Sequence, residues 1–137
     1  MNHLSNEGIE WVVEGVLARS CRPGRWVEGD PGGTVSEWLQ KAKSMGIRSI
    51  ICLLTDEELQ EKYFRYAINL LVEYEQRNIH VSRISVLDYC NPPLDSVQLT
   101  QLGEKFAALP KPCLIHCSAG VDRTGCAVAY LLNHAAV

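Results

Sequence analysis

The sequence shows no excess of positive charge, no long apolar stretch and no internal repeat. Thirteen Lys and Arg residues stand against sixteen Asp and Glu residues, which gives a net charge of −3 at pH 7. That balance does not favour broad electrostatic binding to nucleic acid or to an anionic membrane. The longest stretch without Asp, Glu, Lys or Arg, residues 124–137, is too short to span a bilayer. The first residues, MNHLSNEGIEWVVEG, lack the basic region and apolar core of a secretory signal, so we expect a cytoplasmic protein without nucleic-acid or membrane partners.

A metal-ligand pattern is also missing. No metal-ligand spacing joins the four histidines, which are scattered at His3, His80, His116 and His134. We therefore expect neither a metal nor another cofactor. The six cysteines fall in a chain without a secretory signal, and several of them lie in apolar runs, so reduced thiols are the expected state.

What is present is the composition of an ordinary globular domain. The 137 residues are 47% apolar and 21% charged, enough for one domain with a real core and too few for two. Apolar runs predict five strands, which cover residues 10–13, 16–20, 47–54, 79–87 and 113–116.

Helix signals alternate with these strands. Capping boxes at Thr34-x-x-Glu37, Thr55-x-x-Glu58 and Asp95-x-x-Gln98 predict three helix starts. The first helix is expected to end at Met45, before Gly46, and the third at Leu109, before Pro110; a last helix covers residues 123–136. After the second box, Leu59, Tyr63, Tyr66, Leu70 and Tyr74 recur at helical spacing. The alternation predicts an α/β fold with a mostly parallel central sheet flanked by helices on both faces.

The segment HCSAGVDRTG, residues 116–125, lies between a predicted buried strand and the amino end of a predicted helix. An open α/β sheet binds its ligands at that place, where backbone N–H groups and the helix dipole together favour an anion. Arg123 follows Cys117 by six residues and can grip two oxygens of the same anion. The field that binds an oxyanion also favours the thiolate of Cys117, which makes it a candidate nucleophile.

This segment resembles the Cys-x5-Arg phosphate loop of the protein tyrosine phosphatase superfamily, and departs from its commonest form chiefly at Asp122, where Gly is usual. Ile84-Ser85-Val86-Leu87-Asp88 looks like the segment that holds the general acid of that family, 29 residues ahead of the Cys. LTDEEL, residues 54–59, and the Tyr-rich stretch after it are similar to the small dual-specificity branch, and within it to the cyclin-dependent-kinase-associated phosphatases. The resemblance covers roughly residues 34–132, and we expect a single phosphatase domain over residues 1–137. Relatives usually continue with further helices, so the domain is expected to be either truncated at its C-terminus or unusually small.

The resemblance also implies a role for each residue of the motif. Cys117 attacks phosphorus, and Asp88 protonates the leaving oxygen and then activates water. His116 orients the loop, and Thr124 donates its hydroxyl to the Cys117 sulfur. Another cysteine, such as Cys52 or Cys90, is a weaker candidate for trapping an oxidised Cys117. The phosphate is bound by the side chain of Arg123 and by backbone N–H groups of Ser118, Ala119, Gly120, Val121, Asp122 and Arg123.

Asp122 has two interpretations. It is a helix-start residue that pairs with Arg123, or it is the acid, as in myotubularin-like lipid phosphatases; we favour the structural interpretation. The loop contains no lysine to bind a polyanionic inositide headgroup. We therefore expect a monomeric phosphatase that acts on phosphorylated proteins or peptides, with phosphotyrosine ahead of phosphoserine and phosphothreonine. Arg19 and Arg22 could weaken this charge argument by folding over the pocket.

Other functions stay open as alternatives. One is a phosphoinositide phosphatase, and another is a phosphopeptide-binding module without catalysis. Low-molecular-weight phosphatases place the acid after the Cys, whereas Asp88 precedes Cys117 here. Rhodanese-type sulfurtransferases lack the Arg-Thr-Gly ending of this loop.

Overall fold

The computed structural model describes residues 8–134. Its central sheet has five strands in the order β1-β2-β5-β3-β4. The first two strands pair antiparallel, and every other pair is parallel. The sheet is therefore mixed and mostly parallel, as the sequence predicts. The strands are β1 (Glu10–Val13), β2 (Leu17–Ser20), β3 (Ser49–Cys52), β4 (His80–Arg83) and β5 (Cys113–His116).

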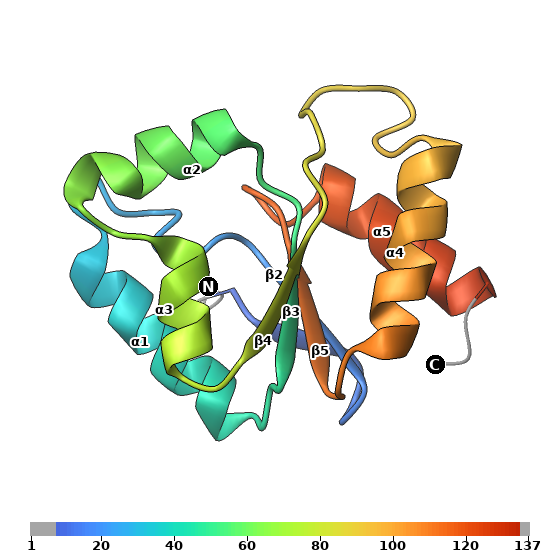
Figure 1. Ribbon diagram of the computed structural model, residues 1–137, viewed down its shortest axis with the longest axis horizontal. Coiled ribbons are helices and arrows are strands. Elements are labelled where there is room, and N and C mark those ends of the chain that lie inside the picture. Colours follow the sequence, from blue (N-terminus) through green and yellow to red (C-terminus); the bar gives the residue numbers. More distant parts are fainter. Residues whose placement is uncertain (1–7, 135–137) are drawn as a thin grey trace.

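Helices cover both faces of this sheet (Figure 1). On one face lie α1 (Gly32–Ser44) and α3 (Leu70–Gln76), and on the other lie α4 (Ser96–Ala108) and α5 (Asp122–His134). The short helix α2 (Asp56–Lys62) and the 3-10 turn η2 (Phe64–Tyr66) follow β3 and lie beyond the carboxyl ends of the parallel strands. The predicted α/β class with helices on both faces is confirmed.

The core has two halves, one on each side of the sheet. Alternation along β3 shows the division, because Ile50 and Cys52 belong to the cluster under α1 and α3, whereas Ile51 belongs to the cluster under α4 and α5. The largest side chain of the first cluster is Trp38, which is fully buried. Cys117 belongs to the second cluster. Both faces of the sheet are therefore packed, and the candidate site lies at the carboxyl ends of its parallel strands.

Three sequence predictions need correction. Helix α1 begins before the predicted box at Thr34, because the chain already turns at Pro31, whose carbonyl accepts the N–H of Val35 at 2.8 Å. The Tyr-rich helix after Thr55 is broken into α2, η2 and α3, with Ala67 in the left-handed region at φ +61°. The strands predicted over residues 47–54 and 79–87 are shorter in the structure and cover Ser49–Cys52 and His80–Arg83. Of the last predicted helix, residues 135 and 136 lie outside the described residues.

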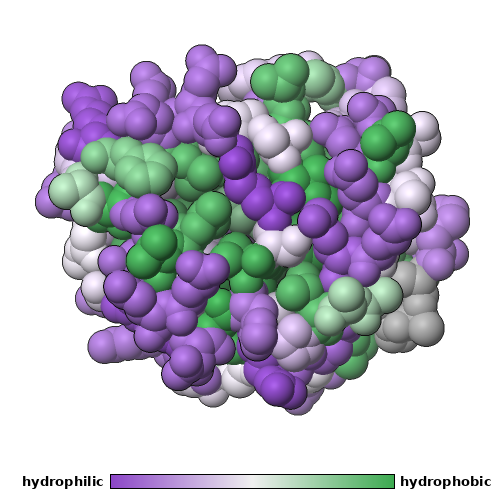
Figure 2. Space-filling model, in the orientation of Figure 1, coloured by the Kyte–Doolittle hydropathy of each residue, from purple (hydrophilic) through white to green (hydrophobic). Residues whose placement is uncertain are grey.

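The capping boxes at Thr55 and Asp95 are confirmed. In each, the side-chain oxygen of the first residue accepts the backbone N–H three positions on, and the Glu or Gln there reaches back to the first N–H. Figure 2 shows a mostly hydrophilic surface around α2, at the upper left of the view. That charged helix forms one wall of the candidate site.

Candidate active site

The loop between β5 and α5 lies at the carboxyl end of the parallel strands and carries the predicted nucleophile. The side chain of Cys117 is only 2% exposed, and its Sγ accepts the backbone N–H of Gly120 at 3.2 Å. The loop therefore turns a backbone donor toward the sulfur. That is the geometry which stabilises negative charge on sulfur or on an oxyanion above it.

Gly120 is required by the backbone at its position. Its φ is +77°, and a Cβ there would lie 2.6 Å from the Ser20 carbonyl oxygen and 2.7 Å from the Cys21 nitrogen. The loop thus packs directly on the chain that leaves β2. Only a residue without a side chain fits both the torsion and the space.

Two arginines near the end of β2 hold the same loop from behind. Arg19 Nη2 donates to the Gly120 carbonyl at 2.8 Å. The backbone N–H of Arg22 donates to the Ser118 carbonyl at 2.9 Å, and its Nε donates to the Ser118 hydroxyl at 3.4 Å. Sequence reasoning allowed these arginines to fold over the pocket; instead they hold the conformation of the loop.

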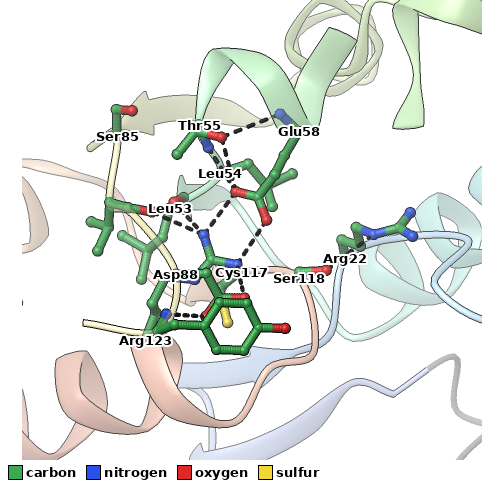
Figure 3. A network of polar contacts seen from close by, with 12 residues as sticks. Arg22, Leu53, Leu54, Thr55, Glu58, Ser85, Asp88, Cys117, Ser118 and Arg123 are labelled. Atoms are coloured by element: carbon green, nitrogen blue, oxygen red, sulfur yellow. Dashed lines mark hydrogen bonds and ion pairs between the residues drawn. The ribbon is translucent and has the colours of Figure 1, made fainter. Parts of the chain in front are cut away.

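Arg123 is fixed by a residue that sequence reasoning did not place in the site. Glu58 receives both ends of the guanidinium, with Nη1 to Oε1 at 2.8 Å and Nη2 to Oε2 at 2.9 Å (Figure 3). Nη1 also donates to the carbonyls of Val86 at 2.9 Å and Leu53 at 3.5 Å. The guanidinium is 1% exposed, so this two-pronged ion pair is largely desolvated.

The same Glu58 carboxylate closes the capping box of α2. Its Oε1 accepts the backbone N–H of Thr55 at 3.0 Å. Since Glu58 is the third helical residue after Thr55, the motif that predicts the helix start also carries the Arg123 partner. No local sequence pattern indicates the contact between Glu58 and Arg123, because only the fold brings residue 58 against residue 123.

The charges of this pair reinforce each other. Burial acts to raise the pKa of Glu58, but the hydrogen bonds from Arg123 and Thr55 outweigh it and the pKa is lowered. Burial acts to lower the pKa of Arg123, but Glu58, followed by Cys117 and Asp88, outweighs it and the pKa is raised. Both groups are therefore charged across the physiological range.

The structure brings Asp88 to the same guanidinium. Its Oδ2 lies 3.4 Å from Arg123 Nη2, and its Oδ1 accepts the N–H of Tyr89 at 3.0 Å. Tyr89 has a left-handed backbone, with φ +62°. The side chain of Asp88 is one-third exposed, so its carboxyl group meets both the arginine and the solvent. Figure 3 shows Asp88, Arg123, Glu58 and Cys117 grouped together.

His116 lies below the loop in the core. Its Nδ1 is 3.2 Å from the Cys117 carbonyl oxygen, and its Nε2 is 2.8 Å from the Tyr74 hydroxyl. Burial lowers the pKa of His116 from 6.5 to about 4, so the ring is neutral at pH 7. Because a carbonyl only accepts, Nδ1 carries the proton and Nε2 accepts from Tyr74.

Thr124 does not make the predicted hydrogen bond to sulfur. Its hydroxyl is buried and has no hydrogen-bond partner, and the Nε of Arg123 is buried without a partner as well. The donor to Cys117 Sγ is the backbone N–H of Gly120 and not the Thr124 hydroxyl. Two buried donors without partners in the first turn of α5 are suited to an anion. Asp122 is exposed in the first turn of α5.

A cavity of about 580 Å³ is lined by Arg123, Asp88 and other residues around the phosphate loop. Five carboxylates face it, from Glu57, Glu58, Glu61, Asp88 and Asp122. Three cations face it, from Arg25, Lys62 and Arg123, and Ser118 and Ala119 of the loop line it as well. Leu87 and Tyr89 also line it and are exposed, with Tyr89 at 93%. Val121, another residue of the predicted phosphate loop, is exposed as well.

All six cysteines are free thiols. Cys52 lies in the core cluster on the opposite side of the sheet from Cys117, and Cys90 is exposed. Neither is placed against the Cys117 sulfur by any recorded contact. Among residues 8–134 no three His, Cys, Asp or Glu side chains gather as a metal site, and no helix is long and apolar enough to cross a membrane.

Comparison with known proteins now decides the family. A family model described as PTP-SAK, the DSP-PTPase phosphatase domain of Swiss Army Knife proteins, matches residues 6–137. The chain belongs to this family. It is therefore a phosphatase of the protein tyrosine and dual-specificity type, as the phosphate loop predicts. No curated protein matches the chain.

Solved structures confirm the fold of this PTP-SAK domain. Kinase-associated phosphatase (KAP), with its catalytic cysteine replaced by serine, superposes with a TM-score of 0.63 at 23% identity, over 88% of this chain and 68% of that one. The core domain of the PP-IP phosphatase SIW14 from S. cerevisiae gives 0.61 at 25%, over 88% and 61%. TpbA from P. aeruginosa, bound to phosphotyrosine, gives 0.55 at 14%, over 92% and 68%. The PTP-SAK chain thus spans less than two thirds of the SIW14 chain.

Proposed function

We propose that this domain hydrolyses phosphotyrosine, and more slowly phosphoserine and phosphothreonine, in proteins or peptides through a cysteinyl-phosphate intermediate, as a cytoplasmic monomer. The observation that carries the proposal is the guanidinium of Arg123. It is buried and fixed by Glu58 on one edge, its Nε has no partner, and its Nη2 lies 3.4 Å from Asp88 Oδ2. An arginine held in this way is preorganised to bind the equatorial oxygens of a phosphoryl group.

The residues of the site then divide the reaction among them. The Cys117 thiolate attacks phosphorus in line, the bond from phosphorus to the substrate oxygen breaks, and Asp88 gives its proton to that oxygen. Water next attacks the cysteinyl-phosphate, Asp88 takes a proton from it, and the thiolate leaves as phosphate forms. Arg123 and the loop N–H groups stabilise the charge in both steps. Glu58 positions Arg123 without touching substrate.

The charge of the cavity supports a substrate with a single phosphoryl group at the nucleophile. Five carboxylates oppose three cations around it, and Glu58 already pairs with Arg123. A ring with several phosphates on it would bring further negative charge toward those carboxylates. Phosphotyrosine brings one dianion and an aromatic ring, and exposed Leu87, Tyr89 and Val121 offer apolar contact.

An inositol phosphate substrate is the second candidate. It is favoured by the similarity to SIW14, a PP-IP phosphatase, at 25% identity. The test is kcat/KM for a phosphotyrosine peptide, a phosphoserine peptide and a soluble inositol polyphosphate, measured at one ionic strength. We expect kcat/KM to be highest for the phosphotyrosine peptide, lower for the phosphoserine peptide and lowest for the inositol polyphosphate. A higher value for the inositol polyphosphate would overturn the charge argument.

A binding module without catalysis is a different class of function. Turnover of para-nitrophenyl phosphate separates the two classes, since a module that only binds phosphopeptides releases no phosphate. We expect turnover that is unaffected by EDTA and abolished in Cys117→Ser. Binding of a phosphopeptide with no turnover by the unmodified protein would support the module instead.

A further inference from the structure

Arg22 is a buried arginine without a carboxylate partner. It is 6% exposed, and none of the ion pairs recorded among residues 8–134 includes it. Its guanidinium carbon lies 5.8 Å from the centre of the Tyr63 ring, and its Nε donates to the hydroxyl of Ser118. In Figure 3 its guanidinium points away from Arg123. A buried cation is costly unless paired, so this group is suited to an anion from outside the chain.

Arg22 lines a second, smaller cavity. We call it the Arg22 concavity; it measures about 130 Å³ and is lined by Arg22, Lys62 and Arg65, with Glu61 as its one carboxylate. The turns at Gly24 and Gly29 form part of its wall. Arg65 is exposed, with its guanidinium 5.4 Å from the Tyr66 ring centre. Three cations against one carboxylate reverse the balance of the catalytic cavity.

The Arg22 concavity adjoins the catalytic cavity. Both are lined by Glu61 and Lys62, on the last turns of α2. Arg22 also contacts the phosphate loop directly, through Ser118. An anion held by Arg22 would therefore lie next to the candidate active site and in contact with a residue that supports it.

We propose that the Arg22 concavity binds a phosphoryl group, in addition to the one that reacts at Cys117. This rests on the proposed function only for the place of the first phosphoryl group. The guanidinium groups of Arg22 and Arg65 and the ammonium of Lys62 supply charge-assisted hydrogen bonds to its oxygens. The group belongs either to a doubly phosphorylated substrate or to free phosphate, and its recognition is the same in both cases.

The test is a titration of inorganic phosphate into Cys117→Ser protein, followed by amide NMR and compared with chloride at equal ionic strength. We expect two groups of amide signals to shift. One group belongs to the loop, residues 117–123, and reports the candidate active site. The other includes Gly24 and Gly29 and reports the Arg22 concavity.

Arg65→Gln is the informative variant, because Arg65 is exposed and lies outside the catalytic cavity. It should weaken the phosphate affinity of the second group of signals about threefold and leave the first group unchanged. Arg48→Gln removes the same charge from an exposed residue just before β3 and should change neither group. Shifts confined to residues 117–123, or equal effects of the two variants, would overturn the proposal and leave the proposed function standing. Shifts confined to the second group would contradict the proposed function alone.

A second comparison assigns the source of the anion. In the active protein, kcat/KM is measured for a phosphotyrosine peptide and for the same peptide with a second phosphorylated residue. A preference of about threefold or more for the doubly phosphorylated peptide, lost in Arg65→Gln and kept in Arg48→Gln, assigns the concavity to substrate. Equal kcat/KM values, with the second group of NMR shifts present, assign it to free phosphate.

Discussion

The ion pair between Glu58 and Arg123 gives the sharpest prediction about how the site is held. Glu58→Gln removes one negative charge and keeps a side chain that can still close the capping box with Thr55. Any change in stability or activity is then caused by the loss of the ion pair with Arg123. Glu57→Gln removes the same charge from the neighbouring residue of the same helix, which is exposed and lines the same cavity, so it is the matched control.

The size of the effect follows from burial. Breaking a buried ion pair from one side costs about 3–5 kcal/mol. Two features reduce that figure here, because the Glu58 side chain is 21% exposed and the carbonyls of Val86 and Leu53 still accept from Arg123. We therefore expect the free energy of unfolding to fall by about 2 kcal/mol in Glu58→Gln.

Activity should fall as well, because the guanidinium is no longer fixed for the phosphoryl oxygens. We expect kcat/KM for para-nitrophenyl phosphate to drop about 10- to 100-fold in Glu58→Gln. Urea unfolding and steady-state kinetics measure the two effects. A loss of stability equal to that of Glu57→Gln, or a lower KM from an arginine freed to grip phosphate, would refute the reasoning.

Three further predictions concern the acid, the loop and the buried histidine. Asp88→Asn should slow an alkyl phosphate about 100-fold and para-nitrophenyl phosphate much less, since para-nitrophenolate leaves with little protonation. Gly120→Ala should lower the free energy of unfolding by about 2 kcal/mol and abolish most activity, because the new Cβ meets backbone at 2.6 Å in a left-handed residue. His116 has its pKa lowered to about 4, so the stability it contributes is complete above pH 6.5 and is lost as the pH falls through about 4. Between pH 6.5 and about 4.5, the native protein should therefore lose about 2 kcal/mol more stability than His116→Gln.

Each of these has a control in the same chain. Asp122→Gly should keep the acid step; a larger loss than in Asp88→Asn, together with loss of the basic limb of the pH–rate profile, would make Asp122 the acid. Gly33→Ala, in open space on α1, should leave stability and activity near those of the native protein. His80→Gln, exposed on β4, should keep the native pH dependence of unfolding; the same dependence in His116→Gln would contradict the assignment.

Local patterns predicted the frame of this fold well. The runs at residues 113–116 and 10–13 match β5 and the edge strand β1. The match of β5 is expected, because a strand buried on both faces needs a continuous apolar run. The boxes at Thr55 and Asp95 are real because side chain and backbone satisfy each other within four residues. The box at Thr34 failed because Pro31 had already begun that helix.

Long-range pairing limited what the sequence could say about the site. Cys117 and Arg123 lie in one loop, so their spacing alone places them together. The contact of Glu58 with Arg123 joins residues 65 apart in the chain, and the support of Gly120 by Arg19 joins residues 101 apart. Such contacts depend on the strand order β2-β5-β3, which no local pattern specifies.

The central claim is that Cys117 carries the phosphoryl group between substrate and water. The direct measurement is rapid acid quench of Asp88→Asn with para-nitrophenyl phosphate, whose leaving group needs little protonation, followed by mass spectrometry of the peptide that contains Cys117. Loss of the base slows hydrolysis of the intermediate, so we expect a phosphate on Cys117 in the quenched sample and none in Cys117→Ser. Turnover by Cys117→Ser, or turnover by the unmodified protein with no phosphate trapped on Cys117, would contradict the account.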